Sequence, residues 1–181
     1  HCERSVLYIS DDQVEGMLHQ AVGPAEGLAC KPGVGLAALV AQSKAPSVLR
    51  SPSTDPRFRP EAYGASAKDV REVLAIPLID FHGNVRGIIE LINATELISA
   101  DEGAEGGDGT EPSAVKASRV KQRPRAFHPR DEHMLKPFAQ LAGIALHNSR
   151  VLQEAERSQP AGGNARLVRR SSMLAMTGAD A

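Results

Sequence analysis

Aromatic residues are scarce in this 181-residue sequence, which has four Phe, two Tyr and no Trp. A surface that stacks nucleic-acid bases uses aromatic side chains, so the scarcity argues against such a surface. An excess of either charge is also missing, because 21 Lys and Arg stand against 22 Asp and Glu, for a formal net charge of -1. Without a bulk field to attract phosphates or an anionic bilayer, we expect neither nucleic acid nor a membrane as a partner.

Cysteines and long apolar runs are equally sparse. The two cysteines, Cys2 and Cys30, are too few for a ligand cluster, and we interpret them as reduced thiols of a cytoplasmic protein. No apolar run approaches the roughly 18 residues of a membrane span, and no signal peptide is recognisable. The chain starts with His1 rather than Met and enters a strand-like segment at once, so we expect a piece of a longer polypeptide.

Short apolar and β-branched runs predict most of the regular structure. Bounded by Gly, Pro and Asp, they predict strands at residues 5–9, 17–22, 47–49, 70–79 and 85–93. The last two flank the turn sequence DFHGN and predict a hairpin. Pro77 within the first of these two strands predicts an edge position or a bulge. The run GLAALVAQ predicts a short helix over 34–42, with its larger apolar residues on one face.

The second half of the chain predicts an insertion and a long helix. Residues 96–125 are acidic and rich in Gly, then basic, which indicates a solvated, disordered insertion. A helix is predicted from Pro129 toward Glu156, with an apolar stripe that includes Met134, Phe138 and Leu141. We therefore expect one domain over 1–156, and a linker or tail toward a following domain over 157–181.

The order of these segments resembles the GAF domains of cyclic-nucleotide phosphodiesterases and related signalling proteins. The resemblance covers about residues 3–156 without the insertion, and runs from ERSVLYI through GVGLAALVAQSKAPSVL, DPRF and REVLAIPLIDFHGNVRGIIELIN to FHPRDEHMLKPFAQLAGIALHNSRVLQE. It implies an α/β (α+β) fold with a central twisted antiparallel sheet of about six strands. In that fold helices pack on one face and a ligand pocket lies on the other.

One part of the resemblance is a structural signature of the phosphodiesterase subgroup: Asn-Lys, a gap, then Phe, three residues and Asp-Glu. The matching residues here are Asn93, Phe127, Asp131 and Glu132, but Ala94 occupies the Lys position. In the family the Lys and the Asp are thought to join the sheet to the last helix. Asp131 therefore needs another partner, which we expect to be its own helix N-terminus or a nearby Arg.

The resemblance also implies ligand-binding residues. Glu90 lies where nucleotide-binding relatives place an acid against the base, and its carboxylate can accept an N–H. The alternatives are a solvent-facing charge and an ion pair with Arg86. Leu36 and Ala37 match a pair whose backbone approaches the ligand at a helix start, and Ser66 matches a hydroxyl position. Relatives that bind ligands carry Ser or Thr where this chain has Val6 and Val70, which argues for a different ligand or for none.

Neither a metal site nor a catalytic site is predicted. His128 and His133 lie near the start of the last helix, but no third residue stands at metal-ligand spacing. No serine lies in a nucleophile motif, and Gly33-Val34-Gly35 is too short for a phosphate loop. We therefore expect no resident cofactor and no enzyme activity in this chain.

The leading hypothesis is a regulatory module that binds a small molecule, with cAMP or cGMP as the first-choice ligand. In this hypothesis the chain acts within a larger signalling protein, such as a cyclic-nucleotide phosphodiesterase, and is joined to a catalytic domain. A homodimer through the terminal helix is also expected, because such helices in the family often pair in parallel. The alternative is a GAF-type domain without a ligand that serves only for dimerisation or interaction.

Overall fold

A computed structural model describes residues 1–99 and 120–158 of the chain. Its strands are β1 (Cys2–Ser10), β2 (Leu18–Val22), β3 (Ala29–Cys30), β4 (Ser47–Leu49), β5 (Val73–Ile79), β6 (Val85–Ser99) and β7 (Val120–Pro124). Its helices are α1 (Leu36–Ser43), the 3-10 helix η1 (Pro60–Asp69) and α2 (Pro129–Ser158). The chain divides into two compact units, His1–Ile144 and Ala145–Ala181. The first unit holds the whole sheet, and the described part of the second is the remainder of α2.

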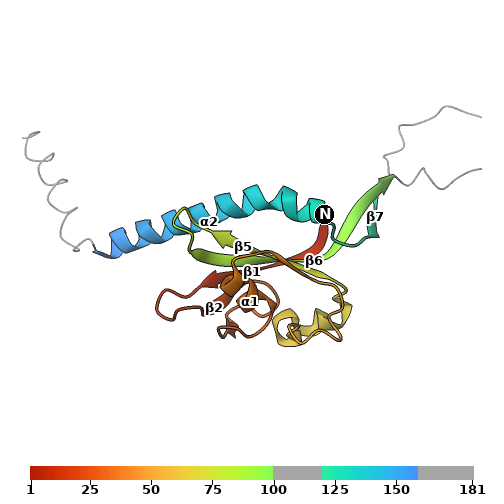
Figure 1. Cartoon of the computed structure of the whole chain (residues 1–181), viewed down its shortest axis with the longest axis horizontal. Coiled ribbons are helices and arrows are strands. Elements are labelled where there is room, and N and C mark those ends of the chain that lie inside the picture. Colours follow the sequence, from red (N-terminus) through yellow and green to blue (C-terminus); the bar gives the residue numbers. More distant parts are fainter. Residues whose placement is uncertain (100–119, 159–181) are drawn as a thin grey trace, which may run out of the picture. The chain divides into compact units, whose positions relative to one another are not determined.

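The sheet is antiparallel, with strand order β3-β2-β1-β6-β5-β4, and β7 pairs with the far end of β6 (Figure 1). Strand β6 is central, since it pairs with β1 on one side and β5 on the other. This confirms the fold expected from the sequence. The predicted hairpin is present, with Ile79 opposite Val85 in the β5–β6 register.

Two local features explain the shape of this hairpin. At its turn, Asp80 accepts hydrogen bonds from the backbone N–H groups of His82 and Asn84, and Gly83 adopts a φ of 78° that favours glycine. Strand β4 is only three residues long and pairs with β5 as far as Ala75. Pro77 therefore lies on a free edge of β5, where its missing N–H breaks no ladder bond, as its sequence position predicted.

One face of the sheet is covered by α1 and η1 (Figure 1). Two glycines lead the chain into the start of α1. Gly33 has a φ of 71° and Gly35 a φ of 87°, values that favour glycine. The core on this face is formed by side chains from β1, β5, β6, α1 and η1, and includes Val6, Tyr8, Leu36, Val40, Tyr63, Val73 and Ile88. Burial of these side chains supplies the main driving force that holds α1 and η1 against the sheet.

Residues 129–144 of α2 pack on the opposite face through small residues. A Cβ added at Gly143 would collide with the backbone carbonyl of Ile79, so the helix backbone rests directly on β5. Ala139, one turn earlier, is also buried. The larger apolar residues of the predicted stripe point elsewhere: Met134, Phe138 and Leu141 are 59%, 66% and 66% exposed. The sequence pattern thus identified the helix, but the face it buries is the small-residue face.

The insertion predicted over 96–125 differs from the structure at its two ends. The last residues of β6 pair with β7 as a two-stranded ribbon, in which Glu96 lies opposite Arg123. Oppositely charged residues across two strands stabilise such a pairing, which the compositional argument did not consider. Residues 100–119, and most of the predicted tail from 159 on, lie outside the described residues. Within the part that is described, no helix has the length and apolar character to cross a bilayer.

Candidate ligand site around Glu90

The centre of the covered face holds a buried carboxylate. Glu90 points from the middle of β6 toward α1 and η1, as do its strand neighbours Ile88 and Ile92, and it is 1% exposed. Ion pairs among residues 1–99 and 120–158 all involve other acids. Arg86, considered above as a partner for Glu90, pairs with Asp80 at 2.7 Å instead. Both alternatives to a buried, inward-facing Glu90 are therefore wrong.

Both tyrosines of the chain donate hydrogen bonds to Glu90. The Tyr63 hydroxyl lies 2.9 Å and the Tyr8 hydroxyl 3.3 Å from the same carboxylate oxygen, Oε2. Tyr8 comes from β1, opposite β6 in the sheet, and Tyr63 comes from η1, which covers it. A carboxylate without a cation is thus held by two neutral donors.

Gln20 on β2 extends this network to the surrounding loops. Its Nε2 donates to the carbonyl oxygen of Ala62 at 2.9 Å and to the Tyr8 hydroxyl at 3.4 Å. Its Oε1 accepts a hydrogen bond from the backbone N–H of Ala25. A Cβ at Gly23 would lie 2.9 Å from that same oxygen, so a side chain at this position would force Gln20 to shift. The network ties β1, β2, η1 and this turn to Glu90.

Burial controls the protonation of the cluster. Desolvation raises the pKa of Glu90 to about 7, although the two tyrosine hydrogen bonds act in the opposite direction. Desolvation, with the nearby Glu90 charge, also raises the pKa of Tyr8, Tyr63 and the half-buried Cys30. The tyrosines therefore stay protonated as donors at neutral pH, while Glu90 stands near its titration midpoint.

The other residues predicted to touch a ligand lie in the same region. Leu36 and Ala37 are buried at the start of α1, in one core cluster with Tyr63 and Ile88. Ser66 is half-buried on η1. The sequence reasoning missed Tyr8, Tyr63 and Gln20. Tyr8 alternates with Val6 on an apolar strand, which was the only signal that its phenol points inward.

A second polar cluster lies farther along β6 and contains the signature residues. Asn93 adopts φ 56°, is 1% exposed and uses all its side-chain hydrogen-bonding groups. Its Oδ1 accepts from the backbone N–H groups of Arg71 and Glu72, and its Nδ2 donates to Glu3 and to the carbonyl oxygen of Asp69. Asn93 therefore fixes the segment between η1 and β5 to β6 and β1.

In the absence of the lysine, Asp131 is bound by Arg125 and by the backbone N–H of His128. Arg125 binds it through two hydrogen bonds of 2.6 Å, one to each carboxylate oxygen, and the backbone N–H of His128 donates at 2.8 Å. Led by the Arg125 hydrogen bonds, these contacts lower the pKa of Asp131 to about 2. Phe127 is buried, and its N–H donates to Glu72 at 2.6 Å. Glu132 lies beside Asp131 in the first turn of α2.

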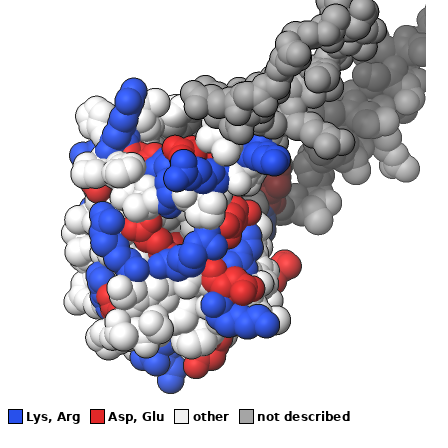
Figure 2. Space-filling model, turned by 90° about the vertical axis from the view of Figure 1, so that its right-hand side faces the viewer, with Lys and Arg blue, Asp and Glu red and all other residues white. Residues whose placement is uncertain are grey.

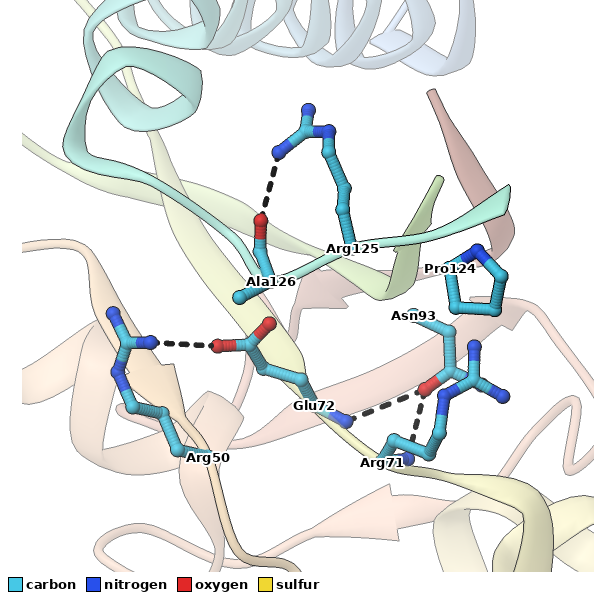
Figure 3. Close-up of a pocket in the computed structure, with 7 residues that line it drawn as sticks. All are labelled: Arg50, Arg71, Glu72, Asn93, Pro124, Arg125 and Ala126. Atoms are coloured by element: carbon cyan, nitrogen blue, oxygen red, sulfur yellow. Dashed lines mark hydrogen bonds and ion pairs between the residues drawn. The ribbon is translucent and has the colours of Figure 1, made fainter. Parts of the chain in front are cut away.

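A pocket of about 350 Å³ lies at this second cluster (Figure 3). It is lined by Arg50, Arg71, Glu72, Asn93, Pro124, Arg125 and Ala126. Each of its three arginines already pairs with a carboxylate, of Glu72, Glu3 or Asp131. Figure 2, seen from the side on which β7 lies in Figure 1, shows basic and acidic side chains interspersed. This cluster is a neutralised structural network.

The six-stranded path of the sheet, with α2 on one face and α1 on the other, defines a GAF-like α+β domain. The family model of the GAF domain matches residues 2–147, and the chain belongs to the GAF domain family. A comparison with curated proteins yields no match.

Solved structures agree with this fold. The GAF domain of a phosphoenolpyruvate-protein phosphotransferase from Coxiella burnetii is 20% identical, with a TM-score of 0.56 over 84% of this chain and 76% of that one. The GAF domain of a sensor histidine kinase from Bacillus halodurans is 11% identical, with a TM-score of 0.56 over 84% and 86%. A type II free methionine-R-sulfoxide reductase from Thermoplasma acidophilum is 16% identical, with a TM-score of 0.51 over 80% and 78%. The chain is thus a GAF domain, a module used in signalling proteins.

The described residues contain no group of three His, Cys, Asp or Glu side chains arranged to hold a metal ion.

Proposed function

We propose that this GAF domain is a regulatory module that binds a small molecule at Glu90. The observation that carries the proposal is the burial of this carboxylate, 1% exposed, with two phenols and no cation around it. An ionised carboxylate in such a place destabilises the fold, and an apolar residue would pack there without that cost. A strongly perturbed acid beneath a covering segment is a typical mark of a functional site.

The surroundings of Glu90 favour a ligand with a polar ring and an anionic group. The N–H groups of Leu36 and Ala37 precede the first intrahelical hydrogen bond of α1, which runs from Leu39 to Gly35. The stem of Arg59 lies against Gly35, because a Cβ built there would be 3.0 Å from its Cγ. A cation and a helix N-terminus on the same side as Glu90 suit a phosphate, so a cyclic nucleotide remains the first ligand to test.

The proposed role is regulatory rather than catalytic. A ligand that orders η1 over the sheet would shift the conformational equilibrium of the domain and alter the output of a neighbouring domain in a cytoplasmic signalling protein. The family membership supports this role, since the matched sensor histidine kinase and phosphotransferase structures are GAF domains of larger enzymes. We assign no nucleophile or acid–base pair to the Glu90 cluster.

The test is a ligand screen by thermal shift, including cAMP and cGMP, on the parent and on Glu90→Gln. The matched control is Glu96→Gln, because Glu96 lies exposed on the same strand. A ligand that raises Tm for the parent and for Glu96→Gln, but not for Glu90→Gln, supports the proposal. Equal shifts in all three proteins would place the ligand elsewhere and end it.

A second function, dimerisation through α2, is favoured by the exposure of its apolar stripe. Met134, Phe138 and Leu141 follow a four-three spacing, which is the seam of a coiled coil, and are 59–66% exposed. Phe138→Glu is expected to turn a dimer into a monomer in sedimentation velocity. The control Gln140→Glu changes an exposed residue off this stripe and is expected to leave the dimer intact. A parent that stays monomeric at about 100 µM, a concentration at which weak dimers associate, would reject this function.

A further inference from the structure

The pocket in the polar cluster around Asn93 is lined by guanidinium groups from three separate parts of the chain (Figure 3). Arg50 directly follows β4, Arg71 precedes β5, and Arg125 directly follows β7. Figure 3 shows the carboxylate of Glu72 between Arg50 and Arg71. Because like charges repel, three guanidinium groups around one hollow favour an anion between them.

The charges of this cluster balance in number, but they differ in how far they reach solvent. The Arg50 side chain is 61% exposed, whereas that of its partner Glu72 is 9% exposed. The Arg71 side chain is 52% exposed, and that of its partner Glu3 is 33% exposed. In both pairs the carboxylate is the more buried partner, so positive charge faces the opening of the pocket. A hollow that presents one sign of charge to solvent concentrates ions of the other sign.

Most side-chain donors of Arg50 and Arg71 have no acceptor within the described residues, since a guanidinium group has five N–H donors. Arg50 contacts Glu72 through Nη1 at 3.2 Å, and its Nη2 donates to the carbonyl oxygen of Phe127 at 3.4 Å. Both distances are longer than the roughly 2.7–2.9 Å of a strong charge-assisted hydrogen bond. Arg71 donates through Nη2 to Glu3 at 2.6 Å. Both groups can therefore bind a further anion.

We propose that this pocket is a second binding site, for a small phosphomonoester whose phosphate is held by Arg50 and Arg71. The tetrahedral oxygens of a phosphate can accept hydrogen bonds from guanidinium groups on two sides, whereas a carboxylate presents one edge to a single fork. The volume of about 350 Å³ exceeds that of a phosphate alone and suits a small organic ligand. Pro124 and Ala126 line another part of the wall and can contact its organic part. The site is independent of the proposed function at Glu90.

A ligand in this pocket lies at the join between the sheet and α2. Arg125 is bound to Asp131 in the first turn of α2, and the N–H of Phe127 donates to Glu72 at the start of β5. Ala126, between these two anchored residues, lines the pocket. Because the ligand needs both sides of this join in place, its binding is expected to raise the Tm of the domain.

The test is an NMR titration with inorganic phosphate and with phenyl phosphate, at neutral pH and constant ionic strength. It follows the Nε–H signals of the arginine side chains. We expect the signals of Arg50 and Arg71 to shift. Phenyl phosphate is expected to bind about threefold more tightly than phosphate, because its ring contacts Pro124 and Ala126.

Arg50→Gln and Arg71→Gln are each expected to weaken phosphate binding at least about tenfold, because each removes hydrogen bonds to a charged group. Arg50→Lys and Arg71→Lys keep the ion pairs of the parent fold but lose the planar fork, and are expected to bind phosphate about threefold less tightly than the parent. The matched control is Arg130→Gln, which removes the same charge from an exposed residue of α2 outside the pocket. Its affinity is expected to stay within about twofold of the parent, since an exposed charge is screened by salt.

Three results would each overturn this inference. The first is binding of neither probe at millimolar concentration. The second is an equal loss in Arg50→Gln and in Arg130→Gln, which would indicate an effect of net charge. The third is a loss in Arg59→Gln without a loss in Arg50→Gln or Arg71→Gln, which would place the phosphate at the start of α1. The proposed function fails separately, when no ligand of the screen distinguishes the parent from Glu90→Gln.

Discussion

Two buried polar clusters lie along the same strand, β6, and they differ in how their buried carboxylates are compensated. Around Asn93 and Asp131, Arg125 and Arg50 provide cations and every buried amide group has a partner. Around Glu90 there are only neutral donors, and the pKa moves up to about 7 instead of down. The Asn93 cluster stabilises the join between the sheet and α2. The Glu90 cluster carries the cost of an uncompensated buried carboxylate, which the proposed binding role would explain.

The largest expected effect is in the Asn93 cluster. Asn93→Ala removes four hydrogen bonds and leaves the N–H groups of Arg71 and Glu72 without their acceptor. We expect the free energy of unfolding in urea to fall by about 4 kcal/mol. Asn84→Ala, at an exposed turn position, is the control and is expected to change it by less than about 1 kcal/mol. Similar losses in both variants would contradict the structural role of Asn93.

The next effect has the opposite sign, a gain of stability on substitution, and lies in the Glu90 cluster. Because the folded pKa of Glu90, about 7, is above its ordinary value of 4.5, its stabilising contribution is complete below pH 4.5 and is lost as the pH rises through 7. The facing groups Tyr8, Tyr63 and Cys30 do not titrate in this window, since their pKa values are raised. Glu90→Gln is therefore expected to gain about 3 kcal/mol over the parent between pH 4.5 and pH 8. Parallel unfolding curves across this range would show that Glu90 is not an uncompensated charge.

A smaller effect, a loss of stability on substitution, is expected at Asp131. Its pKa is lowered to about 2, so its contribution is present above pH 3.8 and is lost as the pH falls toward 2. The pair with Arg125 is partly solvated, with side chains 21% and 23% exposed, and we expect Asp131→Asn to cost about 1 kcal/mol at pH 7. The difference from the parent should shrink in acid, and a constant difference from pH 7 to pH 2 would argue against the ion pair.

The smallest effect is expected at Thr95 on β6, which lies opposite Pro124 where the ribbon with β7 begins. It is 2% exposed, and its hydroxyl has no hydrogen-bond partner within the described residues. Thr95→Val keeps the shape and removes the unsatisfied hydroxyl, so the free energy of unfolding is expected to stay equal or rise by up to about 1 kcal/mol. A clear loss in thermal unfolding would indicate a partner for this hydroxyl.

Sequence reasoning reached the fold because each part of it has a local signal. Apolar periodicity located the β5–β6 hairpin and α2, and the acid on an apolar strand singled out Glu90. It also anticipated that an arginine or the helix N-terminus would satisfy Asp131, and both do. These inferences depend on residues close in the chain or on one strand.

The rest depends on contacts between distant segments. That both tyrosines meet on Glu90, from 82 and 27 residues away, has no local pattern. The close approach of Gly143 to Ile79 is also a tertiary contact, and it explains why the large apolar residues of α2 remain exposed. The ribbon at the ends of 96–125 depends on pairing across the intervening residues, which composition alone does not register.

The most direct test of the contrast between the two clusters is a carboxyl NMR titration that follows Glu90 and Asp131 in one sample. The account predicts a midpoint of about 7 for Glu90 and about 2 for Asp131. On saturation with a bound ligand that donates N–H groups, such as cGMP, the Glu90 midpoint should fall by at least about one unit while that of Asp131 stays unchanged. A Glu90 midpoint near its ordinary value of 4.5 in the absence of ligand would contradict the account.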